Sequence, residues 1–478
     1  MKDGVLLASR SFRLVDQKEF AALSGDFNPM HLDPVAARRT QAGAPVVHGI
    51  HLLVWALNAL AAAHKDLPSL RSLRARFTQV VYLDLPVEAQ LVQLDAQGAR
   101  LSVCVHGGAM AQIQLVFGAP DAEATSLAGF STHRIHPAAQ PVELSLEEIS
   151  GFSGQLAFAP EAEAVASLYP DLARWLGAQR VVSLLTSTYL VGMVCPGLHS
   201  LYGEIAVDTC AVDDLPDALA FRASEPRYRM VKQQVAGGGL RGTIKCFVRM
   251  PPVEQASMAT LEKWVTAGEF AGQVVLVVGG SRGLGELTAK LIASGGGEVI
   301  LTWRSGKQEA DKVAKAIRET GGRCEVLAYD ARQPAEEQLA SMKLIPTHLY
   351  YFATPPIFQV ATENYSSTRF SEFSSIYLDG FAGLLQALWK RQPRVSAFYP
   401  SSVAIEQRPR GVTEYAMAKA AGEILCADLS LALESLHITV SRLPRLSTDQ
   451  TASITEVQTA SSLETLLPLI REVQSWPR

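Results

Sequence analysis

Residues 274–285 read VVLVVGGSRGLG, and this stretch decides how the last part of the chain folds. Five consecutive apolar residues, 274–278, are typical of a strand buried on both faces of a parallel sheet. The glycines after them permit a tight turn, and a helix is predicted over 285–294. Strand, glycine-rich turn and helix in this order predict a site for the phosphates of a dinucleotide, because a helix N-terminus attracts negative charge.

Strands and helices continue to alternate beyond this stretch. The predicted strands are short and apolar, and a charged helix separates the second from the third. This order is typical of an α/β fold with a doubly wound parallel sheet of the Rossmann type. The further strands are predicted at 298–302, 324–329, 348–352 and 396–400, with a helix over 306–319.

The residues after the second strand bear on the choice of cofactor. A dinucleotide fold that prefers NAD normally places an acidic residue there, on the ribose 2′-hydroxyl. This chain has Thr-Trp-Arg-Ser at 302–305, without a carboxylate. Arg304, together with Arg282 in the glycine-rich turn, favours the 2′-phosphate of NADP. The alternative interpretation is that both arginines are solvated surface residues.

Three polar residues further along form a catalytic pattern. Tyr415 and Lys419 are four residues apart and are therefore neighbours on one helical face. The nearby cation favours the phenolate, which makes Tyr415 a better proton donor and acceptor near neutral pH. Ser402 ends a predicted strand thirteen residues earlier. A tyrosine–lysine pair alone is most often a surface pair, but the turn, the serine and the pair in this order are far more specific.

From about residue 272 to about residue 451 the chain resembles the short-chain dehydrogenase/reductase family, especially its 3-oxoacyl-thioester reductases. The resemblance implies that Tyr415 protonates a carbonyl oxygen while NADPH delivers hydride, that Ser402 hydrogen-bonds that oxygen, and that Lys419 binds the nicotinamide ribose. It also implies that NADP(H) contacts Gly279, Ser281, Arg282, Gly283, Leu284, Gly285, Arg304, Asp330, Ala331 and Lys419, with Asp330 at the adenine.

The chain departs from this family at three places. Phe-Ala-Thr-Pro at 352–355 replaces the usual Asn-Asn-Ala-Gly, and Pro444-Arg445 replaces a Pro-Gly. Tyr377 stands where the family has a helix asparagine that supports a proton relay. These departures leave the activity of the reductase-like region open.

A second motif lies near the N-terminus, where residues 24–31 read SGDFNPMH. Pro29 fixes its own φ and biases Asn28 away from helix, so the segment is predicted to turn. The turn can bring Asp26 and His31 to one small-molecule site, where a carboxylate and an imidazole on either side of a water form a general acid/base pair. The alternative is an ordinary Asx-turn with a solvated histidine.

This segment resembles the MaoC-like (R)-specific enoyl-CoA hydratase/dehydratase family, which has the hotdog fold. The matching residues are 24–31 and the Val-Val-His-Gly of 46–49. The resemblance implies that Asp26 and His31 are the catalytic pair, and that the N–H of Gly49 helps to polarise a thioester carbonyl. The helix after Gly49 would be the central helix of the hotdog.

The region after about residue 143 looks like a degenerate second copy of the first. Residues 150–154 can be laid over 20–25, which sets Gln155 in the place of Asp26 and Pro160 in the place of His31. Neither replacement can transfer a proton, so this copy is predicted to complete an acyl-binding tunnel without catalysing. Its central helix is predicted over 181–194, where the apolar residues are equally consistent with pure core.

Two linkers, 119–142 and 250–271, divide the chain. The predicted architecture is a double hotdog of the α+β class followed by the Rossmann-type sheet. We expect a catalytic hotdog at 1–120, a degenerate hotdog at 143–250 and an NADP-binding domain at 271–478.

Composition excludes several other classes. The net charge is −4 with no block of like charge, which argues against nucleic-acid binding. The N-terminus has only a short apolar run, and no apolar stretch is long enough to cross a bilayer, so no signal peptide, membrane span or membrane partner is predicted. Six scattered cysteines without paired spacing favour a reducing cytoplasm and no metal site.

The two chemistries share a hydroxyacyl thioester, so the sequence predicts a bifunctional reductase and dehydratase. The alternatives are a monofunctional hydratase with an impaired reductase-like domain, and a non-catalytic scaffold that binds acyl chains or an acyl-carrier protein. The thioester carrier, coenzyme A or acyl-carrier protein, stays open, and a homodimer is expected.

Overall fold

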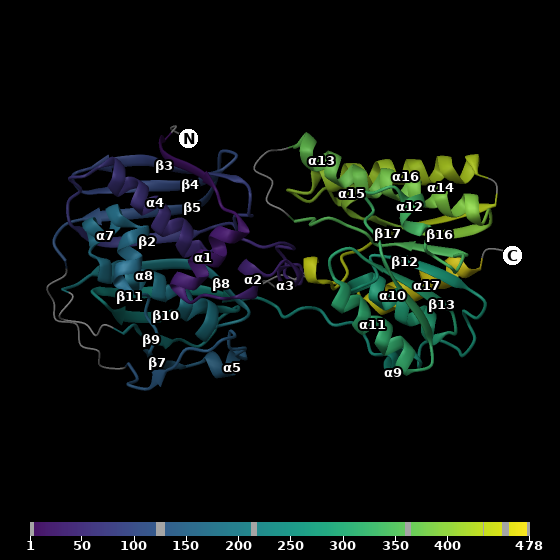
Figure 1. Cartoon of the computed structure of the whole chain (residues 1–478), viewed down its shortest axis with the longest axis horizontal. Coiled ribbons are helices and arrows are strands. Elements are labelled where there is room, and N and C mark those ends of the chain that lie inside the picture. The colour runs from purple at the N-terminus through teal and green to yellow at the C-terminus, as the bar shows by residue number, and fades with distance from the viewer. Residues whose placement is uncertain are drawn as a thin grey trace. The chain divides into compact units, whose positions relative to one another are not determined.

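The computed structural model describes residues 4–120, 130–211, 218–358, 365–433, 435–451 and 458–475. The chain divides into two compact units, residues 1–251 with 453–456, and residues 252–452 with 457–478. The first unit contains a mainly antiparallel sheet with helices against it, and the second contains a parallel sheet (Figure 1).

The first half of unit one is a five-stranded antiparallel sheet that packs on one long helix. Its elements are β1 (Val5–Ser11), α4 (Gly49–Ala63), β2 (Leu70–Phe77), β3 (Pro86–Asp95), β4 (Gly98–Val105) and β5 (Gly108–Phe117). The strands lie in the order β1-β3-β4-β5-β2, with α4 between β1 and β2 along the chain. Alternate residues of β5 are buried, which gives the sheet one face for the helix.

The second half repeats this arrangement. Its elements are β7 (Ser153–Leu156), α8 (Ala178–Tyr189), β8 (Ser200–Thr209), β9 (Ala220–Ala223), β10 (Met230–Gly237) and β11 (Leu240–Val248). The order β7-β9-β10-β11-β8 matches that of the first half strand for strand, and α8 again follows the first strand. The predicted double hotdog is confirmed, and β2 pairs with β8 so that both halves share one sheet, with β6 (Arg134–Ile135) at its edge.

Short helices surround the two long ones. They are α1 (Leu14–Ser24), α2 (Pro29–Leu32), α3 (Pro34–Ala37), α5 (Leu146–Ile149), α6 (Ala162–Leu168) and α7 (Pro170–Leu176). Helix α8 continues as a π-helix, η1 (Leu190–Val194), so the segment predicted as one helix over 181–194 changes its pitch at Leu190. Helices α4 and α8 pack against each other inside the unit.

The residue-by-residue alignment of the two repeats differs from the one that the sequence suggested. Ser24 ends helix α1, whereas Ser153 begins strand β7, the equivalent of β1. Gln155 therefore lies on a strand and does not stand in for Asp26. The equivalent of the Asp26 region is the segment between β7 and α8, residues 157–177, which contains no histidine. A short Ser-Gly match is weaker evidence than the order of strands, which fixes the correspondence.

Unit two contains a six-stranded sheet in the order β14-β13-β12-β15-β16-β17. All neighbouring strands are parallel, which confirms the predicted Rossmann-type sheet. The strands are β12 (Val274–Val278), β13 (Glu298–Trp303), β14 (Arg323–Ala328), β15 (His348–Tyr351), β16 (Val395–Ser402) and β17 (Leu436–Leu443). The helices are α9 (Met258–Leu261), α10 (Gly283–Ser294), α11 (Lys307–Glu319), α12 (Ala335–Leu339), α13 (Ser367–Ser374), α14 (Phe381–Arg391), α15 (Ala404–Gln407), α16 (Thr413–Ala432) and α17 (Ser462–Gln474), with a π-helix η3 (Ser375–Gly380) and a 3₁₀ turn η4 (Asp449–Thr451).

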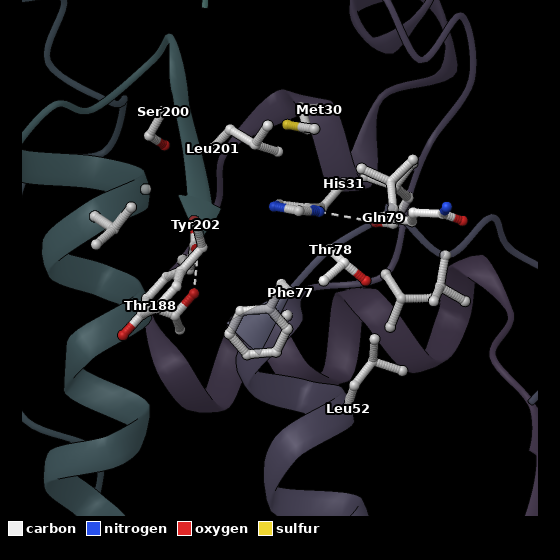
Figure 2. Close-up of a pocket in the computed structure, with 18 residues that line it drawn as sticks. Met30, His31, Leu52, Phe77, Thr78, Gln79, Thr188, Ser200, Leu201 and Tyr202 are labelled. Carbon is white, nitrogen blue, oxygen red and sulfur yellow. Dashed lines mark hydrogen bonds between the residues drawn. The ribbon is translucent and has the colours of Figure 1, made fainter. Parts of the chain in front are cut away.

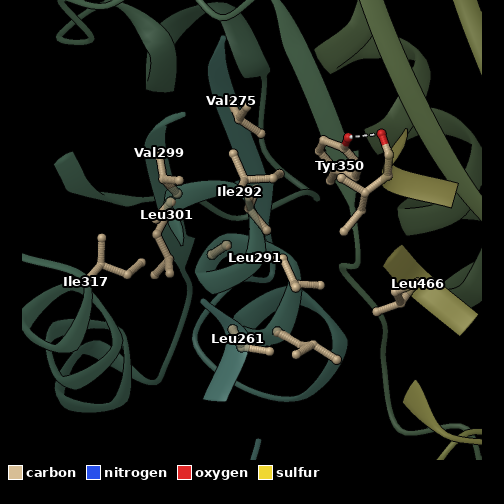
Figure 3. Packing of buried hydrophobic residues seen from close by; sticks show 14 of the residues in the cluster. Leu261, Val275, Leu291, Ile292, Val299, Leu301, Ile317, Tyr350 and Leu466 are labelled. Carbon is tan, nitrogen blue, oxygen red and sulfur yellow. Dashed lines mark hydrogen bonds between the residues drawn. The ribbon is translucent and has the colours of Figure 1, made fainter. Parts of the chain in front are cut away.

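Both faces of this sheet are buried, as a continuous apolar strand predicts. Val275 and Val277 of β12 point to one core with α10, α11 and α17, and Leu276 and Val278 point to the other. Figure 3 shows the first core, where Ile292 and Leu291 of α10 lie beside Val275 and Leu301. These two cores fix the carboxyl ends of the strands, where the second candidate site lies.

The linkers and domain boundaries stay predictions. Part of the first linker, residues 121–129, lies outside the described residues. The second linker contains the short helix α9 and belongs largely to unit two. Within the described ranges, no helix combines the length and apolar character needed to cross a membrane.

Candidate functional site

Asp26 and His31 lie on either side of the turn that the Asn28-Pro29 pair predicted. Helix α1 ends at Ser24, and Gly25 takes a left-handed conformation (φ 74°) that turns the chain inward. Pro29 then opens helix α2, and the Asn28 side chain caps it by accepting a hydrogen bond from the N–H of Met30. The two helix ends thus direct Asp26 and His31 toward the same space.

The Asp26 carboxyl group is buried, with 2% of its surface exposed. Its Oδ2 accepts a hydrogen bond from the hydroxyl of Thr188 at 2.6 Å, and its Oδ1 accepts one from the N–H of Asn28 at 3.2 Å. Burial raises the pKa of Asp26 to about 6, and the two hydrogen bonds oppose this rise. The carboxyl group is therefore ionised at neutral pH but close enough to its pKa to exchange a proton.

His31 is held in one tautomer. Its Nδ1 donates to the main-chain oxygen of Val46 at 2.8 Å, so the lone pair of the neutral ring is on Nε2. Burial lowers the pKa of His31 to about 4. The ring stacks on His48 with 3.8 Å between centroids, and His48 in turn donates from Nε2 to the main-chain oxygen of Asp26 at 3.1 Å. His31 is thus neutral and oriented.

A cavity of about 200 Å³ adjoins Asp26, His31 and Gly49. A carboxylate oxygen of Asp26 and a ring nitrogen from each of His31 and His48 all lie within 4.8 Å of one another. One water molecule can bridge groups at this spacing. Figure 2 shows the His31 ring across the cavity from Thr188 and Tyr202. The lining from the first half includes Met30, Leu52, Phe77, Thr78 and Gln79, and that from the second half includes Thr188, Val191, Ser200, Leu201 and Tyr202.

Gly49 is the first residue of helix α4, as predicted, and it borders the cavity. The first N–H groups of a helix have no acceptor within that helix, so they are available to a developing negative charge. A Cβ on Gly49 would lie 3.3 Å from the Phe77 ring, so the position leaves little room for a side chain.

The second half supplies residues of this site that the sequence did not reveal. Four serine and threonine residues of α8 are buried, and three of them, Ser183, Thr186 and Ser187, donate to main-chain carbonyl oxygens. Thr188 instead reaches the Asp26 carboxylate of the other half. A buried threonine in an apolar helix was the available signal, but nothing in the sequence gave its partner.

Gly192 of η1 lies against the same carboxylate. A Cβ built there would come within 2.1 Å of Asp26 Oδ1. π-helical turns occur frequently at functional sites, and this one brings a residue without a side chain to the Asp26 carboxyl group.

The glycine-rich turn has the geometry that a dinucleotide needs. It connects β12 to α10, and Thr302 at the end of β13 binds it through the N–H of Gly279 at 3.1 Å. A Cβ on Gly285 would lie 2.3 Å from the oxygen of Gly279, so only glycine lets the helix approach the turn. Gly283 (φ 59°) faces open space. The residues present therefore fit a dinucleotide phosphate at the N-terminus of α10.

The two arginines assigned to the 2′-phosphate differ in their surroundings. Arg304 is exposed after β13, and Ser281 is buried in the turn. Arg282 forms an ion pair with Asp449 at 2.7 Å, and that aspartate also accepts a hydrogen bond from the N–H of Val253.

The other residues predicted to contact the cofactor lie near the same edge of the sheet. Asp330 and Ala331 follow β14, where the Asp330 carboxylate accepts a hydrogen bond from the N–H of Arg332. Leu284 lies half-buried in the first turn of α10.

Ser402, Tyr415 and Lys419 come together as predicted from their spacing. Ser402 ends β16, and its hydroxyl hydrogen-bonds that of Tyr415 on α16. Burial raises the pKa of Tyr415, and only the Ser402 hydrogen bond opposes this rise. The Lys419 ammonium group donates to the Pro400 oxygen at 2.6 Å.

Comparison with known proteins identifies both parts of the chain. Residues 6–111 match the MaoC like domain family, and residues 273–349 match the short chain dehydrogenase family. The chain combines a MaoC-like domain at its N-terminus with a short-chain dehydrogenase domain, which confirms both resemblances. The second match also supports a nicotinamide cofactor in the glycine-rich turn.

Three curated relatives share segments of these domains. The peroxisomal hydratase-dehydrogenase-epimerase of Saccharomyces cerevisiae is 37% identical over 67 residues, covering 14% of this chain and 7% of the relative. The (R)-specific enoyl-CoA hydratase of Aeromonas caviae is 50% identical over 44 residues, covering 9% and 33%. The 3-oxoacyl-[acyl-carrier-protein] reductase FabG of Aggregatibacter actinomycetemcomitans is 35% identical over 71 residues, covering 14% and 29%. The matched segments thus span at most 33% of the length of these relatives.

Solved structures also align with part of the chain. A 3-oxoacyl (acyl-carrier-protein) reductase from Agrobacterium tumefaciens with NADP bound is 20% identical at a TM-score of 0.35, over 38% of this chain and 73% of that chain. Acetoin dehydrogenase YohF from Salmonella typhimurium is 20% identical at a TM-score of 0.36, over 43% and 88%.

Proposed function

We propose that the chain is a bifunctional acyl-thioester enzyme. One site reduces a 3-oxoacyl thioester to the (3R)-hydroxyacyl thioester, and the other interconverts this alcohol and the trans-2-enoyl thioester. The observation that carries the proposal is that each candidate site brings its predicted side chains together. Asp26 and His31 face one cavity, and Ser402 hydrogen-bonds Tyr415 one helical turn before Lys419.

The hydratase chemistry follows from the protonation states. At neutral pH the Asp26 carboxylate and the Nε2 of His31 are both hydrogen-bond acceptors. A water molecule between them donates both hydrogens and therefore turns its oxygen lone pairs toward the substrate.

In hydration, the water oxygen forms a bond to Cβ while Asp26 takes one of its protons, and that proton is then delivered to Cα. In dehydration, Asp26 takes the Cα proton and returns it to the departing hydroxyl group, so water leaves. The negative charge that develops on the thioester oxygen is stabilised by the N–H of Gly49 at the start of α4.

The reductase chemistry uses the second set. A nicotinamide cofactor held at the glycine-rich turn would supply a hydride. Tyr415 donates its proton to the carbonyl oxygen, Ser402 hydrogen-bonds that oxygen, and Lys419 holds the nicotinamide ribose. Gly279, Gly283 and Gly285 let the backbone approach the pyrophosphate, and Asp330 with Ala331 borders the adenine.

We assign NADP(H) as the cofactor on three grounds: no carboxylate follows β13, Arg304 is exposed there, and Arg282 lies in the turn. The substrate is an acyl thioester of coenzyme A or of an acyl-carrier protein, and a homodimer remains our expectation. All six cysteines are buried and none forms a disulfide in the described structure, which supports a reducing compartment such as the cytoplasm.

The test is NADPH oxidation by the purified chain with acetoacetyl thioester, followed by identification of the products. The proposal expects both 3-hydroxybutyryl and crotonyl thioesters. Asp26→Asn should abolish interconversion of those two and spare reduction, and Tyr415→Phe should do the reverse. Loss of both activities in either folded variant would refute two independent sites.

A second candidate function is a hydratase with a non-catalytic cofactor domain. The aromatic residue Tyr377 at the lysine favours it, since the related family has asparagine there. Hydration of crotonyl thioester together with NADPH binding, but without NADPH oxidation, would establish this alternative.

A further inference from the structure

We propose that Tyr377 is a positioning residue of the reductase site, whose ring holds the ammonium group of Lys419 where the nicotinamide ribose needs it. The inference deepens the proposed reductase function and rests on it. Tyr377 would take over a task that a polar side chain performs in the resembling family, and would do so through its aromatic face.

The ammonium group of Lys419 has aromatic rings on two sides. Its nitrogen lies 3.8 Å from the centroid of the Tyr377 ring and 4.8 Å from that of Tyr399. Its remaining contact is the 2.6 Å hydrogen bond to the Pro400 oxygen. In the part of the chain that the structure describes, no carboxylate forms an ion pair with it, so the Pro400 oxygen and the two rings supply the negative potential around the buried cation.

A buried lysine without a carboxylate needs such a partner. Only 5% of Lys419 is exposed, and burial lowers its pKa to about 7. The face of an aromatic ring attracts a cation, and the attraction strengthens when water is excluded. The ring of Tyr377 therefore favours the charged form of Lys419, which is the form that can donate to ribose hydroxyl groups.

Tyr377 acts through its ring, because its hydroxyl group is already engaged. That hydroxyl shares a 2.5 Å hydrogen bond with Thr354, and the ring stacks on Phe373 at 5.8 Å. The residue lies in the π-helix η3, only 1% exposed, and meets the edge of Tyr415 at 5.9 Å. It cannot turn away from Lys419 without breaking these contacts.

The second ring needs a gap in helix α16. Gly422 stands one turn after Lys419, and a Cβ there would lie 2.0 Å from the hydroxyl oxygen of Tyr399. The glycine thus lets Tyr399 lie close to the helix that carries the lysine. Tyr377, Tyr399 and the Pro400 oxygen form what we call the lysine box.

The experiment measures NADPH affinity by fluorescence titration and kcat for acetoacetyl thioester in the full chain. Tyr377→Phe keeps the ring and should stay within about 3-fold of the wild type in both quantities. Tyr377→Leu removes the ring and should weaken NADPH binding and lower kcat by about 10-fold or more. If the leucine variant is unstable at assay temperature, Tyr377→Met replaces it.

A double-mutant cycle with Lys419→Met separates positioning from packing. In that background, Tyr377→Leu should lower NADPH affinity and kcat by less than about a further 2-fold, because the cation that the Tyr377 ring holds is gone. The matched control is Phe270→Leu, a fully buried ring in the core on the other side of the sheet from Tyr377 and Tyr399. This control substitution should change NADPH affinity and kcat by the same factor in the wild-type and Lys419→Met backgrounds.

The outcomes distinguish the inference from the proposed function. Equal losses from Tyr377→Leu in both backgrounds, or failure of Tyr377→Phe to preserve affinity, would overturn the inference while wild-type reduction stands. A wild-type chain that neither binds nor oxidises NADPH would overturn the reductase function, and the inference with it.

Discussion

The carboxyl group of Asp26 is under two opposing influences that come from single residues. Its burial favours the neutral form, whereas the Thr188 hydroxyl and the Asn28 N–H stabilise the charge. The balance leaves the pKa near 6, between that of an exposed aspartate and that of a buried one without donors. His31, by contrast, is kept neutral by burial, so the two groups titrate apart.

Hydration should lose rate as the solution becomes acidic. Protonation of Asp26 below a pH of about 6 converts an acceptor into a donor, which can no longer take a proton from water. The rate should therefore rise with pH through about 6 and then level off. The initial rate of crotonyl thioester hydration from pH 4.5 to 8.5 checks this. A rate that is flat below pH 6 would contradict it.

Thr188→Val should move that acidic limb to higher pH. Valine has the same shape but cannot donate, so the pKa of Asp26 should rise by about 1 unit, which is the value of one hydrogen bond to a charged group. The hydration rate at pH 6 should fall about 5-fold, with little change at pH 8.5. Thr188→Ser keeps the hydroxyl and serves as the control. An equal loss at every pH would mean that Thr188 only packs.

Asp449 affects the cofactor turn through Arg282. Its carboxylate neutralises the arginine at 2.7 Å and would compete with a cofactor phosphate for it. Asp449→Asn keeps the acceptor for the Val253 N–H but removes the charge, so NADPH should bind about 3- to 10-fold more tightly, because a phosphate no longer competes with a carboxylate for Arg282. Titration with NADPH and NADH checks this, and equal gains for both would place Arg282 away from the 2′-phosphate.

At the scale of elements, both candidate sites contain a π-helix. Element η1 brings Gly192 to Asp26, and η3 brings Tyr377 to Lys419. A π-turn widens the helix by one residue, which rotates the following side chains relative to an α-helix. Each of these turns therefore directs one residue at a charged group of the site.

Gly192→Ala should disable the hydratase. A methyl group 2.1 Å from Asp26 Oδ1 must displace the carboxylate, so hydration should fall at least about 100-fold, the cost of a misplaced catalytic group. Reduction of acetoacetyl thioester by the same protein is the internal control and should be unchanged. Retention of more than a tenth of the hydration rate would show that the carboxylate can shift without loss.

At the scale of the whole molecule, the two halves of unit one build one site together. Strands β2 and β8 join the halves into one sheet, and helices α4 and α8 pack inside it. Asn28 connects the halves near the Asp26 carboxylate. Its buried Nδ2 lies within hydrogen-bond distance of the main-chain oxygens of Gly192, Gly197 and Leu198.

Asn28→Ala should destabilise this unit. It leaves buried carbonyl oxygens without a donor, which costs about 2 to 4 kcal/mol in the free energy of unfolding. The comparison is Asn58→Ala, because half-buried Asn58 also bridges the halves but by one bond, to the N–H of Leu172 at 3.1 Å. Chemical unfolding should rank Asn58→Ala nearer the wild type, and equal losses would contradict the role assigned to Asn28.

Local patterns determined much of this protein. The run 274–278 with its glycines identified a parallel sheet and a phosphate turn, because strand burial and turn geometry depend on adjacent residues. The Asn28-Pro29 turn placed Asp26 near His31 for the same reason. The spacing of Tyr415 and Lys419 gave one helical face. These features use interactions within a few residues, which a sequence displays directly.

Contacts between distant segments were decided only by the tertiary structure. Thr188 and Gly192 lie more than 160 residues from Asp26, and nothing near them in the chain indicates their neighbour. The Arg282–Asp449 pair and the lysine box around Lys419 likewise depend on which strands lie side by side. The order of strands also corrected the alignment of the second repeat, because hydrogen bonding between strands, and not a shared Ser-Gly pair, establishes which residues correspond.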